Sequence, residues 1–222
     1  MQGRSGISTA TPNRLIFDSG ELFLNIDTTA IETPLDDAYI MSFMSTGQPF
    51  VVAPRFDLAD TLAPATSLGA TRGGASFNPG REIREIDVDG SLGPVFRMRR
   101  RASVTPTLTA TLLEVSRHNL QMAIAGSQSE STGGFQRLRG GPIVDGTYID
   151  NVALIATYSG SVHTGRDEPV VMVVTDALVT EINDVSLEGQ NEPALEVTFT
   201  GHFDPGYIDY EPWIIYHPDD VL

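Results

Sequence analysis

Two segments alternate strictly between apolar and polar side chains, and this alternation constrains the fold more than any other feature. In "TLTATL", residues 107–112, leucine and alanine alternate with threonine, and in "LEVTFT", residues 195–200, apolar residues alternate with glutamate and threonine. A period of two places the apolar side chains on one face of a β-strand. We therefore predict two strands, each with one face buried and the other toward solvent or an interface.

Other segments predict further strands and one helix. The stretches "YIDNVALIATYSG" and "EPVVMVVTDALVTEI" are strand-like, and "LIFDSGELFLNI" is typical of a hairpin. In "SRHNLQMAIAG", Ser116 is placed to cap a helix that stops at Gly126. The segment 127–142, rich in Ser and Gly, is interpreted as flexible. Together these patterns predict a mainly β fold, a β-sandwich or barrel with one short flanking helix and long loops.

The length of 222 residues is compatible with a single domain, which we place at 14–222. Residues 1–13 lack periodicity and are predicted to be a flexible arm. A proline-rich stretch at 27–69 reads as a long loop and a candidate interface. The N-terminus does not resemble a secretory signal, and no apolar run is long enough for a membrane anchor, so we expect a soluble protein.

The charge is strongly acidic and unevenly distributed. The chain has 14 basic residues, all of them arginine, against 29 acidic residues, a net charge of −15. Residues 167–222 contain 13 of the acidic residues and no arginine. Such a field repels phosphate backbones, so the sequence argues against a protein that holds nucleic acid.

The stretch "REIREIDVDGSLGPVFRMRRR" places an acidic row and a basic row on either side of a glycine-containing turn. The candidate residues are Glu85, Asp87, Arg97, Arg99 and Arg101. If Asp87 lies opposite Arg97 and Glu85 opposite Arg99, the two rows share one face of a hairpin and form a charge ladder. We favour this interpretation, with the ladder as a subunit contact, over a phosphate-binding patch. Arg100, on the opposite face, has no partner in this scheme.

The sequence offers little catalytic chemistry. It has no cysteine for a nucleophile or metal site, and it has no lysine, which a Walker-type reading of "GATRGGASF" requires. Two His-x-Asp pairs, at His202 and His217, suit either a metal site or turns, and we favour turns because proline follows each. Trp213 is interpreted as a core or edge anchor rather than a ligand-stacking ring. We predict no catalytic, cofactor-binding or metal-binding residue and no enzyme activity.

The order of several segments resembles a known family. These are "LGATRGGASFNPGREIREIDVDGSLGPVFRMRRRASVTPTLTATLLEVSRHNLQMAIAG", then "LEVTFTGHFDP" and "EPWIIYHP". They resemble the major tail tube proteins of long, non-contractile-tailed bacteriophages over roughly residues 14–26, 68–126 and 168–217. The resemblance implies a β-sandwich subunit with a flanking helix. It also implies that subunits close into hexameric rings, which stack into a tube.

The resemblance also implies partners and a location. The subunit would bind copies of itself, the tape measure protein and the tail-tip and tail-terminator proteins, within a virion tail assembled in the host cytoplasm. DNA would pass through an acidic lumen without specific binding. The alternatives are a virion-decorating or carbohydrate-binding β-sandwich, whose expected mark is a concave patch of clustered aromatic residues, and a hydrolase with acidic catalytic groups. Along the sequence the aromatic residues are scattered.

Overall fold

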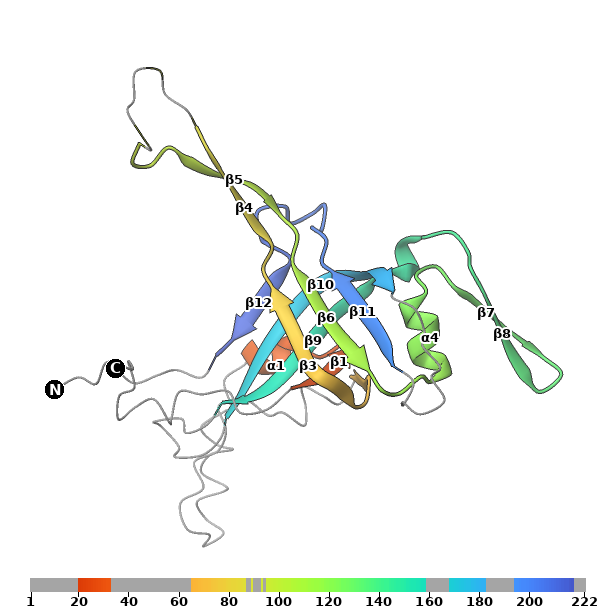
Figure 1. The fold of residues 1–222 in the computed structure, drawn as a ribbon. Coiled ribbons are helices and arrows are strands. Elements are labelled where there is room, and N and C mark those ends of the chain that lie inside the picture. The colour runs from red at the N-terminus through yellow and green to blue at the C-terminus, as the bar shows by residue number, and fades with distance from the viewer. Residues whose placement is uncertain are drawn as a thin grey trace, which may run out of the picture. The chain divides into compact units, whose positions relative to one another are not determined.

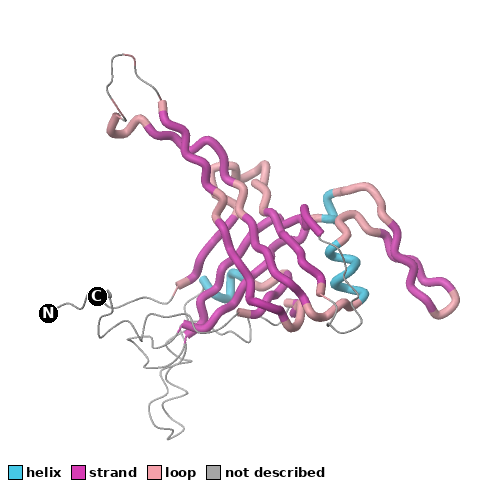
Figure 2. Tube along the Cα trace, in the orientation of Figure 1, coloured by secondary structure: helices cyan, strands magenta, loops and turns pink. Residues whose placement is uncertain are grey.

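The computed structural model describes residues 20–32, 65–86, 89, 93, 95–158, 168–182 and 194–217. The predicted arm at 1–13 and most of the predicted loop at 27–69 lie outside these ranges. The chain forms two compact units, the first built from residues up to 70, 151–173 and 215 onward, the second from 71–150 and 174–214. Strands dominate both, so the predicted mainly β class is confirmed (Figures 1 and 2).

The first unit is a small antiparallel sheet. It contains β1 (Glu21–Leu24), α1 (Thr28–Glu32), β2 (Thr66–Ser67), most of β9 (Ile149–Tyr158), the first part of β10 (Glu168–Ile182) and the end of β12 (Trp213–Tyr216). Strand β1 pairs with β2 on one side and with β9 on the other. Ile26, Ala153, Val171 and Val173 form its buried cluster. The Asn151 side chain accepts from the Ile26 N–H and donates to its carbonyl oxygen, which continues the pairing beyond β1.

The second unit contains an antiparallel sheet in the order β10, β11, β6, β3. Its strands are the second part of β10, β11 (Leu195–Thr200), β6 (Thr107–Leu112) and β3 (Thr71–Asn78). In the β6–β11 register Leu112 faces Leu195 and Leu108 faces Phe199, and all four side chains are fully buried. The alternation in both segments therefore matches burial, and both predicted strands are confirmed.

The predicted helix and its N-terminal cap are also confirmed. Helix α4 spans Arg117–Ala123, and the Ser116 hydroxyl oxygen accepts from the backbone N–H of Asn119 at 3.1 Å. The buried Asn119 amide donates to the Glu114 carbonyl oxygen at 2.7 Å, which fixes the chain leading into the helix. A 3-10 turn at Asp145–Thr147 later leads into β9.

The interpretation of 127–142 as flexible is wrong. This segment contains β7 (Gln128–Thr132) and β8 (Phe135–Arg139), which pair with each other in a separate two-stranded ribbon. Gly133 and Gly134 join them with φ angles of 56° and 86°. Positive φ at both central residues is the type I′ geometry that matches the twist of a hairpin, and glycine adopts it without strain.

A second two-stranded ribbon is formed by β4 (Arg81–Glu85) and β5 (Arg99–Val104), the region of the predicted charge ladder. Within the described residues these strands pair with each other and not with the main sheet (Figure 1). They nevertheless continue β3 and β6 directly along the chain.

Candidate functional site

Two prolines mark the place where the β4–β5 ribbon separates from the sheet. Pro79 lies between β3 and β4, and Pro106 lies between β5 and β6. Proline has no N–H to donate, so neither residue can donate to a ladder at this level, where the Thr105 N–H donates to the Gly80 carbonyl oxygen at 3.0 Å. Gly80 has a φ of 58°, and a Cβ there would lie 1.8 Å from the Thr105 carbonyl oxygen, so the turn requires glycine.

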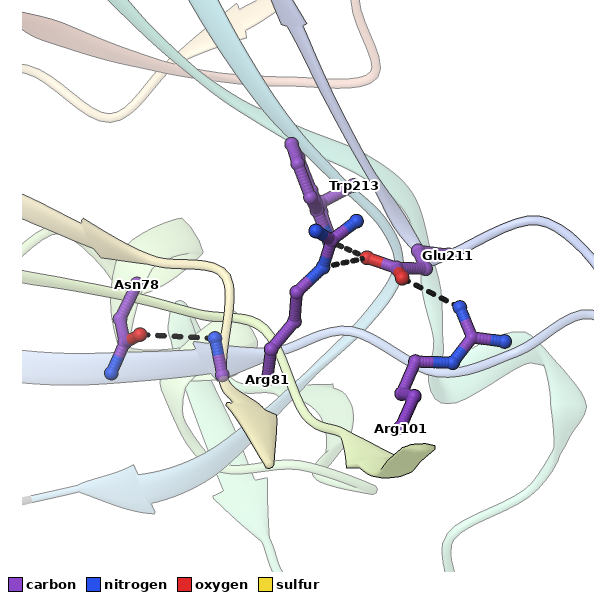
Figure 3. A network of polar contacts seen from close by, with 6 residues as sticks. Asn78, Arg81, Arg101, Glu211 and Trp213 are labelled. Atoms are coloured by element: carbon purple, nitrogen blue, oxygen red, sulfur yellow. Dashed lines mark hydrogen bonds and ion pairs between the residues drawn. The ribbon is translucent and has the colours of Figure 1, made fainter. Parts of the chain in front are cut away.

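A polar network centred on Glu211 lies at the base of this ribbon (Figure 3). Arg81 Nε donates to Glu211 Oε2 at 2.7 Å, and Arg101 Nη1 donates to Oε1 at 2.5 Å. Trp213 Nε1 donates to Oε2 at 2.8 Å. The Glu211 side chain is 11% exposed, whereas both arginines are about half exposed. The carboxylate is therefore enclosed by its donors, and the arginines extend outward from it.

A β-bulge brings the two arginines to the same face of the ribbon. The register shifts between Glu82 and Ile83, so Ile83 faces Arg101 rather than Ala102. Because side chains alternate along a strand, this shift places Arg101 on the face of Arg81. Both guanidinium groups then reach the same carboxylate.

The donors around Glu211 change its acidity. The hydrogen bond from Arg81 lowers the pKa of Glu211 from its ordinary value of 4.5, and the bonds from Arg101 and Trp213 lower it further, against the opposing effect of burial. Glu211 is thus held as a carboxylate. Arg81 also lies over the Trp213 ring, 5.2 Å from the centroid, and Trp213 meets Phe77 edge-on at 6.0 Å. Trp213 is therefore an anchor between the strands, as predicted.

Beside this network is an open hollow with a volume of about 580 Å³. The residues of its wall that matter here are Arg81, Arg101, Tyr207, Tyr210, Glu211 and Trp213. Its three aromatic residues, Tyr207, Tyr210 and Trp213, come from one segment of seven residues.

The two tyrosines stand on an ordered loop. The Asp204 carboxylate accepts from the Gly206 N–H at 2.7 Å, and the Tyr207 N–H donates to the Asp204 carbonyl oxygen. A second turn follows, in which the Tyr210 N–H donates to the Tyr207 carbonyl oxygen at 3.1 Å. Tyr207 is 66% and Tyr210 75% exposed. These hydrogen bonds hold the backbone of both residues, so their rings are presented to solvent from a defined position.

The outer part of the ribbon is exposed on both faces, and the exposed apolar side chains here are Ile83 on β4 and Phe96 in the turn that precedes β5. Arg84 lies directly opposite Arg100 across the strands. Like charges in this position repel. Among the described residues no carboxylate lies within ion-pair distance of either, and Arg100 makes only long contacts to the carbonyl oxygens of Arg97 and Arg99.

The five residues of the predicted ladder have different surroundings. Glu85 faces Arg99 as predicted, with Arg99 Nη2 and Glu85 Oε2 at 3.3 Å. Arg97 lies in a turn with a φ of 67°, two residues before β5 begins at Arg99. Its backbone is not extended, so its side chain does not continue the basic row of the strand. Arg101 binds Glu211 instead of a carboxylate of the ribbon. Asp87 lies outside the described residues, and the role of the set as subunit contacts stays a prediction.

Sequence reasoning missed Glu211 and the hollow. Glu211 directly precedes Pro212 and the sole tryptophan, and no spacing relates it to the arginines of the ribbon. The only available signal was the density of aromatic residues in "GYIDYEPW", which indicates a surface of unusual composition but not its shape.

The His-x-Asp pair at His202 forms a turn, the interpretation that we favoured. The Asp204 carboxylate binds the Gly206 N–H, and His202 Nδ1 lies 3.0 Å from the Asp176 carbonyl oxygen. Tyr148 contacts the His202 ring edge-on at 5.2 Å. Burial raises the pKa of Asp176 above its ordinary value of 3.8, as do the charges of Asp204 and Asp150, while His202 opposes them. Asp219, of the second pair, lies outside the described residues.

No family model and no curated protein sequence matches this chain. Among solved structures, one titled "Crystal structure of Hcp protein" is similar, with a TM-score of 0.31 and 12% sequence identity over 81% of this chain and 86% of that chain. A TM-score this low does not establish a common fold or function. In the part of the chain that the structure describes, neither helix has the length or the apolar character needed to cross a bilayer.

Proposed function

We propose that this chain is a structural subunit that assembles with copies of itself into rings, and that the rings stack into the tail tube of a long, non-contractile bacteriophage tail. On this proposal each ring is a hexamer, and the protein resides in the virion after assembly in the host cytoplasm. The tape measure, tail-tip and tail-terminator proteins are its further partners. Its role is structural and not enzymatic.

The observation that carries this proposal is the exposed β4–β5 ribbon. An isolated two-stranded hairpin is at best marginally stable in water. The ribbon nevertheless keeps Ile83 and Phe96 65% and 83% exposed. Residues of this kind on an unsupported ribbon are typical of a segment that is covered by a partner. A second copy of the chain is the partner that a self-assembling subunit always has available.

Charge supports the same partner. Arg84 and Arg100 face each other, and among the described residues no carboxylate lies within ion-pair distance of either. The whole chain nevertheless carries a net charge of −15. A basic ribbon therefore finds an acidic surface on any other copy, and such complementarity favours orientation and rapid association. The remaining acidic surface repels DNA, which suits a conduit through which a genome passes without binding.

The test combines mass and shape. The purified chain is studied by light scattering across concentration and salt, and the same sample is imaged by negative-stain electron microscopy. Rings or tubes of uniform width are expected. A matched pair of variants then locates the contact: Ile83→Thr with Phe96→Ser on the ribbon is expected to abolish assembly, whereas Ile208→Thr, equally exposed but off the ribbon, retains it.

A compact monomer at high concentration leads to a second step, in which purified tail tips are added as an initiator. If the chain still forms no polymer with the tips, it is not a tube subunit.

A further inference from the structure

We propose that the hollow beside the Glu211 network is a binding site for a neutral saccharide, one or more pyranose units of a glycan. This inference concerns a different surface from the β4–β5 ribbon and does not depend on self-assembly. It is carried by the aromatic rings, the charge balance and the available polar groups of the residues that line the hollow; Figure 3 shows Arg81, Arg101, Glu211 and Trp213 among them.

The hollow is of the size and composition of a ligand site. Its volume of about 580 Å³ falls within the range of about 300–1,000 Å³ that small-molecule sites occupy. Tyr207 and Tyr210 contribute two exposed aromatic rings to the wall, beside Trp213, whose ring packs against Arg81 and Phe77. Such rings present an apolar face with a polar edge, which suits a ligand that is apolar on one face of its ring and polar around the rim.

The charge of the hollow indicates a neutral ligand. Its wall contains two guanidinium groups, from Arg81 and Arg101, and two carboxylates, from Asp209 and Glu211, so their formal charges cancel. A phosphate or sulfate group would be repelled by Asp209 even as the arginines attract it, and a cation would be repelled by both arginines. A ligand that offers hydroxyl groups as donors and acceptors avoids both penalties.

Polar groups remain unused within this wall. Arg81 donates to Glu211 through Nε, and among the described residues its terminal nitrogens have no acceptor. Within the same part of the chain, Asp209 and the hydroxyls of Tyr207 and Tyr210 are exposed and make no side-chain hydrogen bond to another described residue. Donors and acceptors are therefore both available to a ligand beside the rings. Glu211 orients the arginines in advance, so binding does not have to order them.

The chain carries its own reporter for this site. Trp213 is the sole tryptophan, so intrinsic tryptophan fluorescence reports on the wall of the hollow. The purified 222-residue chain is titrated with maltotriose, cellotriose and triacetylchitotriose, and with an array of neutral glycans. Saturation-transfer NMR of the same sugars gives a readout that does not depend on Trp213. We expect a saturable change in fluorescence with at least one neutral glycan.

Matched variants distinguish the site from general effects. Tyr207→Ala with Tyr210→Ala is expected to weaken binding by about tenfold or more, because two ring contacts are lost. Tyr207→Phe with Tyr210→Phe keeps the rings and is expected to retain most of the affinity. Phe135→Ala removes an equally exposed ring from the β7–β8 ribbon and should leave binding unchanged. Circular dichroism checks that each variant is folded.

Three results would overturn the inference. The first is that no neutral glycan changes the fluorescence or gives a saturation-transfer signal. The second is that only sulfated oligosaccharides bind. The third is that Trp213 fluorescence changes with protein concentration alone and the tyrosine-to-alanine variant lowers the assembled mass, which would make the hollow a contact between copies. None of the three removes the tube proposal, which is judged by the ribbon variants and electron microscopy.

Discussion

Arg101 and Glu211 are separated by 110 positions in the sequence, yet Arg101 Nη1 lies 2.5 Å from Glu211 Oε1. Together with Arg81, this contact ties the base of the β4–β5 ribbon to the segment before β12. The Glu211 side chain is 11% exposed and that of Arg101 47%, so the carboxylate is shielded from water by its donors while the guanidinium group stays accessible. Glu211 therefore links both strands of the ribbon to this segment.

Replacing Glu211 by glutamine is expected to lower the free energy of unfolding by about 1–3 kcal/mol at neutral pH, because hydrogen bonds to a charged group are lost and two guanidinium groups remain. Urea denaturation followed by Trp213 fluorescence measures the change. The matched control is Glu196→Gln on β11, an exposed carboxylate, for which a change within about 0.5 kcal/mol is expected. Equal effects of the two substitutions would show that the network contributes no stability.

The contribution of Glu211 should also depend on pH. Its pKa in the folded protein lies below 4.5, so the folded state binds this proton less readily than the unfolded state. The stabilisation is therefore fully present above the unfolded pKa and is lost as the pH falls through the folded pKa. Unfolding free energies from neutral to acid pH should show the difference between wild type and Glu211→Gln shrinking below 4.5. A difference that is constant with pH would contradict this.

The contribution of Asp176 to stability should depend on pH in the opposite direction to that of Glu211. Burial raises its pKa above 3.8, so the folded state favours the protonated form, and this contribution is lost as the pH rises through the folded pKa. Asp176→Asn is therefore expected to raise the melting temperature at neutral pH, with a gain that vanishes in acid. Asparagine also tolerates the φ of 47° at this position. Asp209→Asn, at an exposed site, is the control, and a loss of stability in Asp176→Asn would refute the prediction.

Ser116→Ala is expected to cost about 0.5–2 kcal/mol, because the backbone N–H of Asn119 loses its acceptor at the start of α4. Ser116→Asp, which keeps a capping oxygen, should restore most of the stability. Thermal unfolding monitored by circular dichroism measures both variants. If the aspartate variant is as unstable as the alanine variant, capping is not the cause.

Arg100→Glu tests the like-charged pair on the ribbon. It places a carboxylate opposite Arg84 and should stabilise the isolated subunit by about 0.2–1 kcal/mol. If the ribbon docks on acidic surfaces of other copies, the same change should reduce assembly at low salt. Light scattering gives the assembled mass and denaturation gives the stability. Unchanged assembly in Arg100→Glu would exclude the charge of this pair from the contact.

Much of the secondary structure could be predicted from the sequence, because its signals are local. The alternation at 107–112 and 195–200 specifies a buried face within each strand, and Ser116 caps a helix from three residues away. The Gly133–Gly134 hairpin carried a local signal too, but the small polar residues around it were taken as evidence for flexibility.

The candidate site was decided by the tertiary structure. The bulge after Glu82 turns Arg101 to the face of Arg81, and a one-residue change of register moves a side chain to the opposite face of a strand. Glu211 then meets both arginines because the antiparallel sheet returns a distant segment to the base of the ribbon. The sequence by itself determined which segments become strands and which faces are buried, since these follow from local periodicity. Which charges meet depends on the register of strands far apart in the chain, and only the packed sheet sets that register.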